Sequence, residues 1–133
     1  MSEERDGPVR VLIVDDQAPF RNAARTVVGL TPGFEVVGEA ESGEQGVEMA
    51  DAMEPDIVLM DINMPGINGI EAIRRIKATH DGTLAFLLST YAVSDLPTDA
   101  RTCGASAYIN KEEFGPDVLE ELWATRGDPT WAA

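Results

Sequence analysis

Asp56-Ile57-Val58-Leu59-Met60-Asp61 is the stretch that decides the fold class of this chain. Its four apolar residues are bounded by Glu54-Pro55, which breaks the chain, and by the turn-rich loop 63–69. A short apolar run between turn signals is typical of a strand that is buried on both faces. Such strands occur in parallel sheets, which helices cover on both sides.

Similar apolar runs recur on either side of this stretch, at residues 9–14, 34–37, 84–88 and 107–109. Segments with apolar residues at helical spacing separate and follow the runs. They begin near Pro19, Ser42, Ile70, Pro97 and Val118. This alternation predicts an α/β fold, a doubly wound five-stranded parallel sheet with five helices. The helix after Pro97 is the weakest of the five, and we expect Ala100 and Cys103 on its inner side.

The length of 133 residues is the usual size of one domain. We expect an N-terminal tail over residues 1–8, one domain over 9–126 and a C-terminal tail over 127–133. Trp131 stands out in the second tail, where an exposed tryptophan would indicate contact with a partner.

The composition narrows the class of protein. A net charge of −14 disfavours direct binding to nucleic acid or to an anionic membrane, and favours cations or a basic partner. No apolar run approaches the roughly 20 residues of a membrane span. The single cysteine cannot form an internal disulfide, which predicts a reducing, cytoplasmic location.

Polar residues that could carry chemistry stand where the predicted strands end. Ligands bind at the carboxyl ends of the strands in open α/β sheets, so we expect these side chains to share one shallow pocket. They are Asp15, Asp16, Asp61, Ser89, Thr90 and Lys111.

Three acids in one pocket call for a cation. Two carboxylates about 4 Å apart repel by about 4 kcal/mol at an effective dielectric near 20. Hard oxygen ligands suit Mg²⁺, which readily shares its shell with a phosphate. A carboxylate beside such a metal can act as the nucleophile toward a phosphoryl donor, while a hydroxyl and an ammonium bind the remaining phosphoryl oxygens. The pattern therefore predicts an aspartyl phosphate.

Taken together, these motifs resemble the receiver domain of two-component response regulators, over roughly residues 9 to 125. The resemblance implies the flavodoxin-like receiver fold, and the loop after Asp61 is similar to that of receivers with a helix-turn-helix output domain, although we expect no output domain here. The matching motifs are Asp15-Asp16, the run from Leu59 to Gly69, Ser89, and Gly104-Ala105 before Tyr108 and Lys111.

The resemblance implies a role for each residue of the site. Asp61 would be the phosphoacceptor, Ser89 the switch hydroxyl and Lys111 the phosphoryl contact. Tyr108 would be the aromatic residue whose rotamer follows phosphorylation. The Mg²⁺ ligands would be Asp15, Asp16, Asp61 and the backbone carbonyl of Asn63.

Partners follow from the same resemblance. A histidine kinase or phosphotransfer protein would donate the phosphoryl group, and a downstream protein partner would read the state. A homodimer stays open. The chain would catalyse only its own phosphorylation and slow dephosphorylation, so we do not expect a turnover enzyme.

Two positions depart from the family pattern. Thr90 stands where a small residue is common, and it would be the working hydroxyl if the alignment shifts by one residue. Glu112 follows Lys111 where proline is common, which predicts a trans peptide and a differently shaped loop.

Other functions fit the sequence less well. An aspartyl phosphatase of the haloacid-dehalogenase type needs an acid where Asn63 stands, and a nucleotide binder needs a phosphate loop where Asp15-Asp16-Gln17 stands. The alternative that stays open is a receiver-like docking or scaffold module that works without phosphate.

Overall fold

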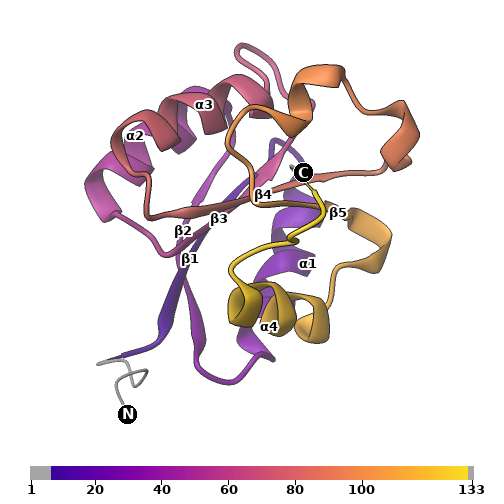
Figure 1. Cartoon of the computed structure of the whole chain (residues 1–133). Helices are drawn as coiled ribbons and strands as arrows, with labels where there is room; N and C mark the ends of the chain where they lie inside the picture. Colours follow the sequence, from indigo (N-terminus) through magenta and orange to yellow (C-terminus); the bar gives the residue numbers. More distant parts are fainter. Residues whose placement is uncertain (1–6, 132–133) are drawn as a thin grey trace.

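The computed structural model describes residues 7–131, which form a five-stranded parallel sheet in the order β2-β1-β3-β4-β5 (Figure 1). The sheet and its topology confirm the predicted fold class. The strands are β1 (Val9–Val14), β2 (Phe34–Ala40), β3 (Ile57–Asp61), β4 (Leu84–Ser89) and β5 (Ala107–Asn110).

Helices cover both faces of this sheet (Figure 1). One core packs the inner residues of α2 and α3 against the sheet, and the other packs those of α1 and α4. The helices are α1 (Ala18–Gly29), α2 (Gly43–Met53), α3 (Gly69–Thr79) and α4 (Pro116–Thr125). Every residue of β3 is buried, as expected for a strand covered on both faces.

The N-terminal ends of α2 and α3 are capped by side chains. The hydroxyl of Ser42 accepts a hydrogen bond from the amide of Gln45 (3.1 Å), and the side chain of Asn68 accepts one from Glu71 (2.9 Å). These caps satisfy amide groups that have no partner within the helix. They fix where the loops after β2 and β3 end.

The prediction of five helices is wrong in one place. Between β4 and β5 the described chain forms two 3₁₀ turns, η1 (Val93–Asp95) and η2 (Thr98–Arg101), in place of an α-helix. Pro97 separates the two turns because it has no amide hydrogen, and the aspartate, serine and threonine residues around it favour caps and turns over helix interiors. Ala100 and Cys103 nevertheless face the core, as expected.

The segment after α4 packs against the domain. The described residues 127–131 turn back toward the sheet (Figure 1), and Trp131 is only 4% exposed. The condition for reading Trp131 as a partner contact, exposure of its side chain, is therefore not met. Gly127 makes the turn possible, because its φ is +112° and a Cβ there would lie 2.7 Å from the carbonyl oxygen of Ser106.

Candidate functional site

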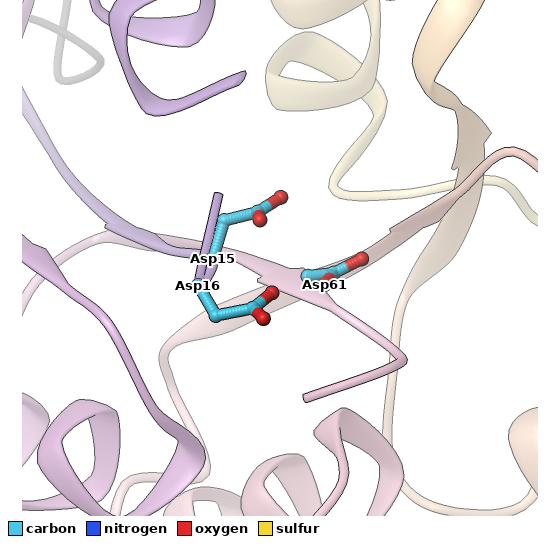
Figure 2. A group of neighbouring side chains, drawn as sticks. All are labelled: Asp15, Asp16 and Asp61. Carbon is cyan, nitrogen blue, oxygen red and sulfur yellow. The ribbon is translucent and has the colours of Figure 1, made fainter. Parts of the chain in front are cut away.

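Three aspartates gather at the carboxyl ends of β1 and β3 (Figure 2). These neighbouring strands pair in parallel, with Val14 opposite Met60, so the residues that follow come close together. Carboxylate oxygens of Asp15, Asp16 and Asp61 lie within 4.8 Å of one another.

The three carboxylates differ in burial. Asp15 is 1% exposed and Asp61 is 6% exposed, whereas Asp16 is open to solvent. The Oδ1 atom of Asp15 accepts a hydrogen bond from the amide of Gln17 (2.8 Å). Within residues 7–131, its Oδ2 atom has no hydrogen-bond partner apart from the ion pair with Lys111. The inner side of the pocket is thus built from two carboxylates that cannot reach bulk water freely.

Lys111 supplies the cation that faces both buried acids. It follows β5 in the 3₁₀ turn η3 (Lys111–Glu113), and its ammonium nitrogen lies 2.7 Å from Asp15 Oδ2 and 3.1 Å from Asp61 Oδ1. The same nitrogen lies 4.6 Å from the centre of the Phe20 ring, a cation–π contact.

Burial and the neighbouring charges shift the titration of both partners. Burial, followed by the charge of Asp15, raises the pKa of Asp61 to about 6, although Lys111 opposes the shift. Burial works against the charged form of Lys111, but the carboxylates of Asp15 and Asp61 outweigh it and raise the pKa of the ammonium. Lys111 therefore stays charged, while Asp61 holds its charge at a free-energy cost.

Beside the carboxylates is a small polar pocket of about 120 Å³. The hydroxyl of Ser89, at the end of β4, is buried and accepts a hydrogen bond from the amide of Tyr91 (3.0 Å). Thr90 is exposed on the rim of this pocket. The lining residues are Gln17, Asp61, Asn63, Ser89, Thr90 and Lys111.

Tyr108 lies farther along the β4–β5 edge and does not line this pocket. Its half-buried hydroxyl donates toward the carbonyl oxygens of Ser89 (3.0 Å) and Tyr91. The ring stacks on that of Trp131, with centroids 6.0 Å apart. Tyr108 is thus linked to the pocket through the backbone of Ser89.

The turn after β3 brings α3 against the site. A Cβ on Gly69 would lie 2.0 Å from the carbonyl oxygen of Asp61, and the amide of Gly69 donates to the carbonyl of Ile62 (2.9 Å). Only glycine allows this close approach. The loop that carries Asn63 is therefore held in a fixed position relative to Asp61.

Sequence reasoning missed several neighbours of the site. Gln17 acts through its backbone amide, which no side-chain pattern reveals. The hydroxyl of Tyr91 accepts a hydrogen bond from the side chain of Asn63 (3.0 Å), across the loops after β3 and β4. Phe20 could have been noticed only as an aromatic residue early in the first predicted helix.

The donor set fits Mg²⁺. Three carboxylates face one ammonium within the described residues, and the buried Oδ2 of Asp15 lacks any other partner. A small hard cation bound by carboxylate oxygens would offset the remaining negative charge. Asp15, Asp16 and Asp61 are the residues that could hold it. The structure gives no separate support for the predicted carbonyl ligand of Asn63.

Within residues 7–131, no helix has the length and apolar character needed to cross a bilayer.

The chain belongs to the response regulator receiver domain family, whose model matches residues 11–123. The nitrate/nitrite response regulator protein NarL of Escherichia coli (strain K12) is 34% identical over 118 residues, which cover 86% of this chain and 53% of that protein. The transcriptional regulatory protein YdfI of Bacillus subtilis (strain 168) is 40% identical over 113 residues, covering 85% and 53%. The chain thus spans about half the length of the curated relatives it matches.

Solved structures agree with this placement. A LuxR-family two-component response regulator from Aurantimonas sp. SI85-9A1 superposes with a TM-score of 0.80 at 29% identity, over 90% of this chain and 85% of that one. The response regulator domain of Thermotoga maritima CheB gives a TM-score of 0.79 at 31% identity, over 92% and 99%. The resemblance to receiver domains of response regulators, LuxR-family ones among them, is therefore confirmed.

Proposed function

We propose that this receiver domain is a signalling switch that accepts a phosphoryl group on Asp61. The observation that carries the proposal is the position of the Asp61 carboxylate, buried at a strand end between two further aspartates and the Lys111 ammonium. The polar pocket of about 120 Å³ beside it can take a compact group such as phosphoryl.

The transfer needs little beyond positioning and charge. A carboxylate oxygen of Asp61 attacks the phosphorus of a phosphohistidine, the new O–P bond forms, and the P–N bond breaks with its electron pair left on the imidazole. Mg²⁺ bound by the aspartates would neutralise charge on the phosphoryl oxygens. Lys111 and the hydroxyl of Ser89 would bind those oxygens.

Thr90, Tyr108 and Asn63 have proposed roles around the phosphoryl pocket. Thr90, on the rim, would limit access of water to the acyl phosphate. Tyr108 would follow the position of the β4 end through its hydrogen bond to Ser89. The carbonyl of Asn63 is retained as a proposed metal ligand.

The proposed phosphoryl donor is a histidine kinase or phosphotransfer protein. The proposed output is contact with a downstream protein partner. A homodimer of this chain is compatible with that output. Some relatives are named as enzymes, but the match does not cover most of their length. The protein-glutamate methylesterase of Alkalilimnicola ehrlichii matches over only 27% of its length, so its name gives no reason to propose that this chain is an enzyme. The cytoplasmic location stays a prediction.

A docking module that works without phosphate is the second candidate. Thr90 and Glu112 favour it, because each replaces a residue that is common beside the pocket in the receiver pattern. In that case the aspartates would serve only as a structural cation site.

Intact-protein mass distinguishes the two functions. We expect wild-type protein incubated with Mg²⁺ and acetyl phosphate to gain the mass of one phosphoryl group, and Asp61→Asn to gain none. Asp51→Asn is the matched control, because it removes an exposed acid on α2 that pairs with His80 away from the pocket. If folded wild-type protein shows no adduct, the docking module becomes the better interpretation.

A further inference from the structure

Segment 127–131 is tied to the domain at both of its ends. The amide of Gly127 donates to Leu122 (2.8 Å) and that of Asp128 donates to Ser106 (2.9 Å), which turns the chain away from α4. At the far end, the Arg101 guanidinium donates to the carbonyl of Trp131 (2.6 Å). The segment therefore links α4 to the β4–β5 connection.

A local turn directs Trp131 inward. The side chain of Asp128 accepts hydrogen bonds from the amide and the hydroxyl of Thr130 (3.0 and 2.8 Å), and the amide of Trp131 donates to the carbonyl of Asp128 (3.0 Å). The path of the chain is thus defined up to the tryptophan.

Trp131 fills the space beside the 3₁₀ turns. Its ring packs with Ala100 and Cys103 in the core on the α2 and α3 side of the sheet. The Arg101 guanidinium lies 4.4 Å from the centroid of the ring, and the ring of Tyr108 stacks against it. Trp131 thereby restrains the ring of Tyr108.

This packing is opposed by one buried polar group. The indole Nε1 of Trp131 is buried and has no hydrogen-bond partner among the described residues. An unsatisfied buried donor gains a hydrogen-bond partner when it reaches water. The free energy of packing segment 127–131 against the domain is therefore less favourable than its apolar contacts alone would give. A modest change beside Trp131 can therefore release it.

We propose that residues 127–131 are a clamp on Tyr108 that phosphorylation of Asp61 releases. The hydroxyl of Tyr108 is held by backbone carbonyls of Ser89 and Tyr91, on the turn that carries the proposed phosphoryl-binding hydroxyl. Movement of Ser89 toward a phosphoryl group on Asp61 takes these acceptors away from Tyr108. The Tyr108 ring then leaves its stack with Trp131, and the clamp opens.

The coupling works in both directions. If a phosphoryl group on Asp61 favours the open clamp, removal of the clamp favours phosphorylation by the same free energy. Trp131 is in this sense a positioning residue, because it acts on the pocket through Tyr108. The inference rests on the proposed function of Asp61 and adds its regulation.

Tryptophan fluorescence tests the release. In Trp123→Phe, Trp131 is the only tryptophan left, because the chain has two. With Mg²⁺ and acetyl phosphate we expect its emission to shift to the red and its quenching by acrylamide to rise roughly twofold or more, as a buried indole becomes exposed. Asp61→Asn in the same background should show neither change.

Intact mass of the same samples separates the possible failures. An adduct on Asp61 with unchanged emission would overturn the clamp and leave the proposed function standing. Absence of an adduct in folded protein would overturn both.

A second measurement uses the rate of adduct formation. If only the open-clamp state reacts with acetyl phosphate, the rate follows the population of that state, so we expect Trp131→Ala to react roughly fivefold faster or more. Arg101→Gln should act in the same direction and leaves the core intact, and Trp123→Phe is the matched control with an unchanged rate. Equal rates in wild type and folded Arg101→Gln would contradict the clamp.

Discussion

The Lys111 ammonium nitrogen lies 3.1 Å from Asp61 Oδ1 and 2.7 Å from Asp15 Oδ2. One cation therefore pairs with two buried carboxylates. Asp16 adds a third negative charge at the rim. The pocket thus carries excess negative charge in a place where Coulomb interactions are stronger than in water. This imbalance should make the stability of the folded chain depend on Mg²⁺ and on pH.

Mg²⁺ should stabilise the folded chain. Binding to the folded state alone adds about 1.4 kcal/mol when free Mg²⁺ is ten times its Kd, which raises the melting temperature by several degrees. Thermal unfolding in EDTA and in millimolar MgCl₂, at matched ionic strength, measures the shift. Asp16→Asn should reduce it, whereas an unchanged melting temperature in the wild type would show that the aspartates do not form a cation site.

Asp61→Asn should stabilise the metal-free protein at neutral pH. Folding raises the pKa of Asp61 from an ordinary value near 3.8 to about 6, so between these values the folded state binds more protons than the unfolded one. The free energy of unfolding of the wild type therefore falls as pH rises through this window, and Asp61→Asn avoids this loss. The difference should grow to about 3 kcal/mol at most by pH 7.

Urea unfolding in EDTA at pH 4, 5, 6 and 7 checks the sign. The stability gap between Asp61→Asn and the wild type should widen with pH, and a gap that narrows would contradict the strained carboxylate. Glu48→Gln, a change at an exposed acid of α2, should show no such trend.

Lys111→Met should have the opposite effect in EDTA. Removal of one partner from a buried ion pair costs about 3 to 5 kcal/mol, because Asp15 and Asp61 then lack a counter-charge. Mg²⁺ can supply that charge, so the stabilisation by Mg²⁺ should be larger in Lys111→Met than in the wild type. Comparison of the two Mg²⁺-induced shifts in melting temperature measures this, and equal shifts would argue against a shared pocket.

Thr90→Ala tests the rim of the pocket. Thr90 lines the pocket and is exposed, so its replacement by a smaller residue should admit water and shorten the lifetime of the acyl phosphate a few-fold. Loss of the phosphoryl mass after removal of the donor gives the rate. If the phosphoryl mass instead fails to form at all, Thr90, and not Ser89, is the working hydroxyl.

The sheet and the gathering of the strand-end residues could be predicted because both follow from local patterns. Asp61 and Lys111 are 50 positions apart in the chain, but Asp61 ends β3 and Lys111 directly follows β5, and parallel strands present their carboxyl ends at one edge. The burial of β3 was predictable for the same reason, since its apolar residues never alternate with polar ones.

Two features of the described chain did not follow from the spacing of apolar residues. The segment around Pro97 has some apolar residues at helical spacing, but it is rich in residues that favour caps and turns, and it forms 3₁₀ turns. The space beside those turns is filled by Trp131, some 30 positions later. A contact of this kind depends on tertiary packing, which the spacing of apolar residues in the sequence does not reveal.

Gly69→Ala should disrupt the site, because an added Cβ would lie 2.0 Å from the carbonyl oxygen of Asp61 and the start of α3 would have to move. We expect a loss of stability of about 3 kcal/mol and a much weaker response to Mg²⁺. Gly29→Ala is the matched control, because a Cβ there would meet no atom within 4 Å beyond its own helix and chain neighbours. Alanine at this helical position should stabilise the protein by about 0.5 to 1 kcal/mol. Urea unfolding with and without Mg²⁺ measures both effects, and a Gly69→Ala variant as stable and as Mg²⁺-responsive as wild type would show that the loop after β3 does not depend on this close approach.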